Sequence, residues 1–109
     1  MIRVTGTYYW QEGAQFDDAY YHGEHMRQAK ELLEPLGLLR LESDRVLHAG
    51  APTAGDAIAV THAYFPDMGV AQSAMTQAGP TLMASLHNYT TLVPKIAFSV
   101  VTTHMETEQ

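Results

Sequence analysis

The fold of this chain is decided by residues 16–26, FDDAYYHGEHM, which begin one amphipathic helix. At about 100° of rotation per residue, a single arc of this helix carries apolar and aromatic residues down to residue 36. The members of that arc are Tyr21, His22, His25, Met26, Ala29, Leu32, Leu33 and Leu36. Charged residues between Glu24 and Glu34 take the opposite side. We therefore expect His25 to lie near the middle of the buried face, where a titratable ring costs free energy unless it has a partner.

Composition restricts the chain to one globular domain. It has 109 residues, of which 46% are hydrophobic and 17% are charged. The net charge of −6, with only six Lys and Arg and no basic run, argues against nucleic acid or an anionic membrane as a partner. The absence of cysteine excludes disulfides and thiolate metal sites and fits a cytoplasmic location. The first residues lack a signal-peptide pattern, and no segment approaches the roughly 18 apolar residues of a membrane span.

Alternating residues and turn signals predict four strands and two helices. The expected strands are residues 2–10, 38–48, 57–65 and 91–103. The first helix should end near Glu34, and the second should run from residue 68 to about 78, with Gly79 and Pro80 separating it from a short turn over 81–86. The order β-α-β-β-α-β is that of a ferredoxin-like α+β domain with an antiparallel sheet. We expect a single domain over residues 1–104 and a polar tail over 105–109.

The second face of the sheet also has to be accounted for. Two helices can cover one face, and a second copy of the same sheet is the simplest cover for the other. The pattern therefore predicts a two-fold homodimer.

Three groups of residues carry a resemblance to a known family. They are Phe16-Asp17, Tyr20-Tyr21 and His25-Met26 on the first helix, His62-Ala63-Tyr64-Phe65 on the third strand, and Asn88-Tyr89-Thr90 before the last strand. With them the chain resembles the EthD family, named for a protein of ethyl tert-butyl ether degradation, over residues 2 to about 101. The resemblance implies a dimeric α+β barrel. A proline often follows the helix histidine in that family, and its place is taken here by Met26-Arg27-Gln28, which implies a different local shape of the helix.

His25 is the best candidate for proton transfer, because its ordinary pKa lies near cellular pH. Tyr21 lies one turn earlier on the same face and could orient the ring or donate to a substrate oxygen. His62 is a third catalytic candidate, and it would frame one pocket with His25 if its side of the strand faces the helices. The alternative is a core histidine that satisfies a backbone carbonyl and has no other role.

Other aromatic and polar residues are candidates for ligand binding. They are Tyr8, Trp10, His22, Tyr64, Asn88 and Tyr89. Tyr8 and Trp10 would form an aromatic wall, or else pack within the sheet or a dimer interface. Asn88 and Tyr89 would lie at the pocket mouth, or else simply make a turn. His22 and His25 are three residues apart, and no third ligand is evident, so no metal site is predicted.

The resemblance leaves the reaction open. Related barrels include cofactor-free monooxygenases, polyketide cyclases, decarboxylases and isomerases. The leading hypothesis is cofactor-independent proton-transfer or oxidative chemistry on a small aromatic or keto compound, in catabolism or secondary metabolism. The alternative is a non-catalytic dimer that binds a hydrophobic small molecule or supports a partner oxygenase.

Overall fold

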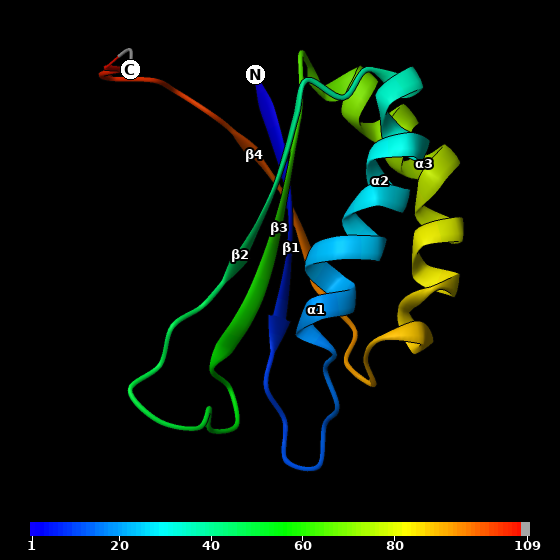
Figure 1. Ribbon diagram of the computed structural model, residues 1–109. Coiled ribbons are helices and arrows are strands. Elements are labelled where there is room, and N and C mark those ends of the chain that lie inside the picture. The colour runs from blue at the N-terminus through cyan, green and yellow to red at the C-terminus, as the bar shows by residue number, and fades with distance from the viewer. Residues whose placement is uncertain (108–109) are drawn as a thin grey trace.

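The computed structural model describes residues 1–107 as one four-stranded antiparallel sheet with helices on one face (Figure 1). The strand order is β2-β3-β1-β4. The strands are β1 Ile2–Tyr9, β2 Arg40–Arg45, β3 Ala57–Phe65 and β4 Lys95–Val100, and the main helices are α1 Asp18–Tyr20, α2 Met26–Leu33 and α3 Met68–Ala84. This arrangement confirms the predicted ferredoxin-like α+β class. Residues 105–107 of the predicted tail have no regular structure, and 108–109 lie outside the described residues.

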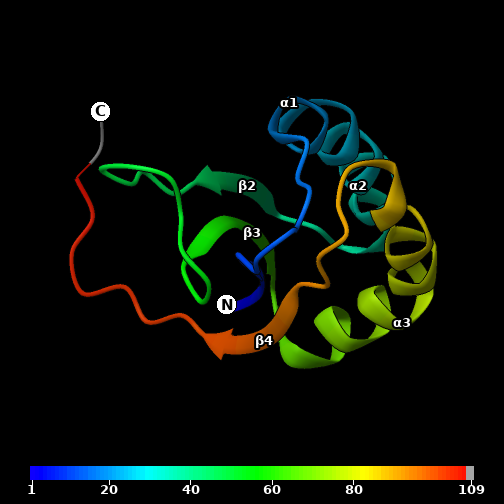
Figure 2. The same cartoon turned by 90° about the horizontal axis from the view of Figure 1, so that it is seen from below.

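The register of the central strand decides which side chains meet the helices. Thr5 of β1 pairs with His62 of β3 and with Ala97 of β4. Side chains alternate along a strand, so Val4 and Tyr8 point to the helices while Thr5 points to the opposite face. Both of the helix-facing residues are buried. Figure 2 shows α2 and α3 on the same side of the curved sheet, with the other face uncovered.

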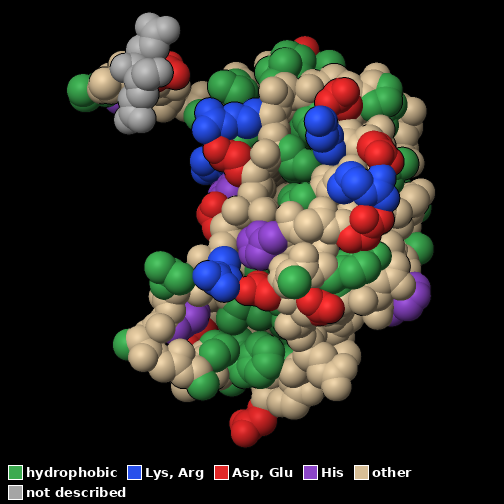
Figure 3. Space-filling view, viewed as in Figure 1, with side chains coloured by type: hydrophobic (Ala, Val, Ile, Leu, Met, Phe, Trp, Pro, Cys, Tyr) green, Lys and Arg blue, Asp and Glu red, His purple; other side chains and the backbone are tan. Residues whose placement is uncertain are grey.

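The first helix begins where the sequence predicts but contains an unpredicted segment. The Asp17 side chain accepts a hydrogen bond from the Tyr20 amide at 3.0 Å and so caps α1. Residues 21–25 are then π-helical, α2 follows, and a 3-10 turn ends at Gly37, whose φ of 102° suits glycine. Tyr21, His25, Ala29 and Leu33 are buried, which confirms the predicted inward face. Figure 3 shows charges of both signs on its outer surface, where Arg27 pairs with Glu24 and Glu31.

Helix α3, which corresponds to the second predicted helix, is longer than predicted. It runs as one element through Pro80, so the expected break at Gly79 and Pro80 is wrong. Pro80 has no amide hydrogen for the carbonyl of Thr76, but both residues are exposed, and solvent can reach that carbonyl. Within the described residues no helix is long and apolar enough to cross a membrane.

Small residues on α3 pack against the sheet. Its buried positions are Ala71, Ala74 and Ala78, which pack with Phe65 in one apolar cluster. A second cluster contains Tyr8, Tyr21, Ala59, Tyr89 and Leu92.

Candidate functional site

A cavity of about 340 Å³ lies between the helices and the sheet. The sheet contributes Val4, Gly6, Tyr8, Leu41, Thr61, Ala63, Ile96 and Phe98, and the helices contribute His25, Ala29, Leu33, Met75, Gly79, Leu82 and Met83, with Leu86 and Pro94 beyond them. None of these lining residues is Asp, Glu, Lys or Arg. Their only titratable side chains are those of Tyr8 and His25. The cavity is therefore apolar, with its polar groups confined to a few positions.

His25 lies at this cavity without a charged partner. It is 6% exposed, and burial lowers the pKa of its imidazole below the ordinary value. Its Nε2 lies 3.4 Å from the hydroxyl oxygen of Tyr89, and its Nδ1 is buried without a hydrogen-bond partner. Among the described residues, no backbone carbonyl accepts a hydrogen bond from the His25 ring, as the alternative of a satisfied core histidine would require. Burial therefore favours the neutral imidazole, and one of its two nitrogens has no hydrogen-bond partner.

The hydroxyl groups of Tyr89 and Tyr8 extend the hydrogen bonding that begins at His25. The hydroxyl oxygens of Tyr8 and Tyr89 are 2.6 Å apart and buried, and burial raises the pKa of both phenols. Tyr89 is held in place because its carbonyl accepts a hydrogen bond from the Asp17 amide at 2.7 Å. Tyr8 lines the cavity, whereas Tyr89 lies behind it and borders an outer groove with Asn88. The loop before β4 thus brings Tyr89 to both Tyr8 and His25.

Tyr21 supports the imidazole from the π-helical segment. Its ring is fully buried and stacks on that of His25 with centroids 5.8 Å apart and planes 16° apart. Its hydroxyl lies 2.5 Å from the hydroxyl of Thr61, and burial raises the pKa of the phenol. Short π-helical segments are frequent at functional sites. Tyr21 is thus placed to orient His25, one of the two roles expected for it.

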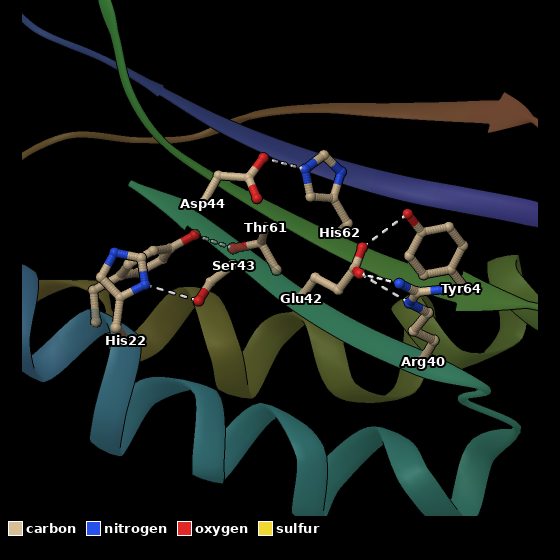
Figure 4. Close-up of polar contacts among 9 residues, drawn as sticks. His22, Arg40, Glu42, Ser43, Asp44, Thr61, His62 and Tyr64 are labelled. Carbon is tan, nitrogen blue, oxygen red and sulfur yellow. Dashed lines mark hydrogen bonds and ion pairs between the residues drawn. The ribbon is translucent and has the colours of Figure 1, made fainter. Parts of the chain in front are cut away.

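His62 lies on the other face of the sheet, so it does not share a pocket with His25. Its Nε2 is 2.7 Å from a carboxylate oxygen of Asp44, and Tyr64 beside it donates to Glu42 at 3.0 Å. Figure 4 shows these groups on the side of β3 opposite Thr61, which points toward the helices. The condition for a shared pocket of two histidines is therefore not met, because neighbouring strand residues point to opposite faces and Thr61 takes the helix side. Tyr64 is two residues beyond His62, so it points to the same face and lies outside the cavity.

Three other ligand-binding candidates also lie outside the cavity. The Nδ1 of His22 contacts the Ser43 hydroxyl at 2.8 Å in a separate surface groove (Figure 4). Trp10 borders a shallow hollow near Val46, and Asn88 is exposed. Of the predicted residues, the structure brings together His25, Tyr21, Tyr8 and Tyr89. In the described part of the chain, no three His, Asp or Glu side chains are placed to hold a metal ion.

Sequence reasoning missed Thr61 and most of the apolar lining. Thr61 shares its side of β3 with Ala59, Ala63 and Phe65, all of which are buried. Their spacing of two residues was a signal that this side faces the core, and it would have placed Thr61 near Tyr21. Met75 and Leu82 carried no comparable signal, because methionine and leucine on a helix are ordinary core residues.

The fold and cavity define a ferredoxin-like α+β protein with an apolar site between helices and sheet. Among solved structures, an EthD-like protein from Ralstonia eutropha JMP134 is similar, with a TM-score of 0.79, 24% identity, and coverage of 95% of this chain and 94% of its own. A protein of the EthD (ethyl tert-butyl ether) family from Bacillus halodurans C-125 has a TM-score of 0.68, 16% identity, and coverage of 94% and 99%. The resemblance to EthD proteins is thus confirmed at the level of the fold. The sequence matches no protein-family model and no curated protein.

Proposed function

We propose that this protein binds an uncharged apolar small molecule in the His25 cavity and transfers a proton to or from it without a cofactor. The observation that carries this proposal is a buried imidazole with an unpartnered Nδ1, in a residue that lines a cavity free of charged side chains. The likeness to EthD-like proteins favours a role in small-molecule catabolism or secondary metabolism.

The lining supports the class of ligand. A carboxylate or ammonium group would lose its hydration in this cavity and find no countercharge, which costs several kcal/mol. Its volume of about 340 Å³ lies near the lower end of the usual range for small-molecule sites. The ligand is therefore small, uncharged and mostly apolar, with one or two polar atoms near His25.

The environment of His25 supports proton transfer. A general base has to be unprotonated before it acts, and burial keeps this imidazole neutral at pH values where a free histidine begins to be protonated. Tyr21 stacks on the ring and limits its rotation. His25 is thus suited to accept a proton from a bound molecule.

The uncovered sheet face supports a homodimer. It carries Arg40, Glu42, Asp44 and His62 in ion pairs and hydrogen bonds, while His62 Nδ1 and Arg3 Nε are buried without partners. A second copy would supply complementary groups of both signs. Sedimentation velocity tests this part of the proposal: a dimer is expected, weakened in Asp44→Lys, and a monomer at micromolar concentration would contradict it.

A carrier without catalysis is the second candidate, and the almost wholly apolar lining favours it. Exchange of ketone protons in D2O separates the two functions. The probe is 1-indanone, whose binding is followed by NMR shifts and whose carbon-bound protons next to the carbonyl are followed by loss of signal. We expect the wild type to bind it and to accelerate exchange, and indane-1-carboxylate to bind at least about tenfold more weakly.

The matched variants are His25→Gln and His104→Gln, the second at an exposed position in the C-terminal segment. Proton transfer predicts that exchange is lost in His25→Gln and kept in His104→Gln. A carrier predicts binding with no acceleration in any variant. Absence of saturable binding, or equal exchange in both variants, would contradict the proposed function.

A further inference from the structure

A hydrogen-bonded chain of three side chains runs from His25 through Tyr89 to Tyr8. His25 and Tyr8 line the cavity, and Tyr89 connects them from behind its wall. His25 Nε2 lies 3.4 Å from the Tyr89 hydroxyl, and that hydroxyl lies 2.6 Å from the hydroxyl of Tyr8. All three side chains are buried. The two end residues of this hydrogen-bonded chain, His25 and Tyr8, therefore both belong to the cavity wall.

The chain has two neutral proton arrangements. In the first, Nε2–H of His25 donates to Tyr89, Tyr89 donates to Tyr8, and the hydroxyl hydrogen of Tyr8 is free for a ligand. Nδ1 then carries a lone pair, which agrees with its having no partner. In the second, every bond runs the other way, so that Nδ1 carries the proton and the Tyr8 oxygen is an acceptor. Each arrangement thus leaves one donor at one end of the hydrogen-bonded chain and one acceptor at the other.

We propose that this chain of three residues tautomerises an uncharged, enolisable ketone, a reading that rests on the proposed function. Tyr8 donates a hydrogen bond to the carbonyl oxygen, and Nδ1 of His25 removes a proton from the adjacent carbon. The C–H electron pair forms the C=C bond, and the carbonyl oxygen takes the Tyr8 proton. Tyr8 is reprotonated by Tyr89, and Tyr89 by Nε2 of His25. The products are the enol and the other tautomer of His25, so atoms and charge balance without any further reactant.

The surroundings favour a transfer that creates no lasting ion. Burial raises the pKa of both phenols and lowers that of the imidazole, so tyrosinate and imidazolium are both disfavoured. The cavity lining contains no charged side chain that would stabilise an enolate. A relay that delivers a proton to oxygen as carbon loses one avoids that enolate. The hydrogen-bonded chain and the apolar lining thus both favour keto–enol tautomerisation without a charged intermediate.

The geometry also narrows the substrate. The ketone needs a hydrogen on the carbon next to the carbonyl, near His25 and Tyr8. The remainder lies against Met75, Leu82, Ile96 and Phe98, which have no polar side-chain group able to bind a charged or strongly hydrated substituent. We therefore assign an alicyclic or aryl ketone whose polar end is the carbonyl alone.

Tyr89→Phe tests the relay, because it removes the central hydroxyl and leaves both groups that meet the ligand. Deuterium uptake by 1-indanone in D2O is measured with its binding constant in the wild type, Tyr89→Phe and Tyr20→Phe. Tyr20 stacks on Tyr89 with centroids 5.8 Å apart, so it is a matched control for aromatic packing. We expect Tyr89→Phe to lose at least about 100-fold in exchange rate while binding changes less than about threefold. Tyr20→Phe should behave as the wild type.

Tyr8→Phe gives a second readout should Tyr89→Phe unfold. Tyr8→Phe should lose exchange to a similar extent and should also bind 1-indanone more weakly, because the carbonyl loses its hydrogen-bond donor. Indane has no carbonyl, so its binding should be the same in Tyr8→Phe and the wild type. Exchange in Tyr89→Phe or Tyr8→Phe within threefold of the wild type, with His25→Gln inactive, would overturn the relay and leave the proposed function standing. Absence of acceleration by the wild type would overturn both the relay and proton transfer.

Discussion

The stability of the protein should depend on pH through His25, with a sign that follows from its burial. Its pKa is lowered in the folded chain from the ordinary value of 6.5. Below about pH 6.5 the unfolded chain binds a proton that the folded chain does not, so the free energy of unfolding falls as pH falls. The stability is complete above the unfolded pKa and is lost between that value and the lowered one. The slope within this window approaches about 1.4 kcal/mol per pH unit for one proton.

Urea unfolding of the wild type and His25→Gln at pH 7.5, 6.5 and 5.5 measures this effect. Because burial lowers the folded pKa of His25, the wild type should lose more stability than His25→Gln between pH 6.5 and 5.5, by at most about 1.4 kcal/mol. Protein concentration is held fixed, because association would also shift the apparent stability. His104→Gln should keep the wild-type slope. Parallel curves for the wild type and His25→Gln would show that the imidazole is not held neutral by burial, and the reasoning would fail.

Three further experiments test the structure that supports the site. Tyr21→Phe and Thr61→Val should each destabilise the protein, and a double-mutant cycle should give a coupling of about 1 kcal/mol for their hydrogen bond; zero coupling would exclude that bond. Gly37→Ala should lower the melting temperature and cost about 1–3 kcal/mol, because φ is 102° and a Cβ would lie 2.6 Å from Val70 Cγ1; an unchanged melting temperature would contradict this turn. Asp67→Ala should cost about 1 kcal/mol in urea, because its side chain caps α3 by accepting from the Val70 amide at 2.9 Å, whereas Asp67→Asn should retain most of that stability.

Periodicity made the buried helix face and the strand faces predictable. Residues 21, 25, 29 and 33 recur every four positions, and all four are buried. Alternation along the third strand placed His62 and Tyr64 on one face. It did not decide which of the two faces is covered by the helices. The register of Thr5 with His62, and the contact of Thr61 with Tyr21, resolve that choice.

The remaining features depend on tertiary contacts that periodicity does not encode. The Tyr8–Tyr89 hydrogen bond joins residues 81 positions apart, and it forms only because the turn before β4 returns the chain to the end of β1. The cavity is lined by small residues from two layers, such as Gly6 of the sheet and Gly79 of α3, and each alone is unremarkable in sequence. The π-helical turn from Tyr21 to His25 has no composition signal of its own.

The most direct test of the central claim is long-range ¹H–¹⁵N NMR of the histidine rings during titration with 1-indanone. The protein has six histidines, which single substitutions to glutamine assign. The account predicts that free His25 is neutral at pH 7 with its proton on Nε2, and that its ring signals alone shift strongly and saturably as the ketone binds. A charged His25 ring, or a saturable shift at His22 or His62 with His25 unchanged, would contradict it.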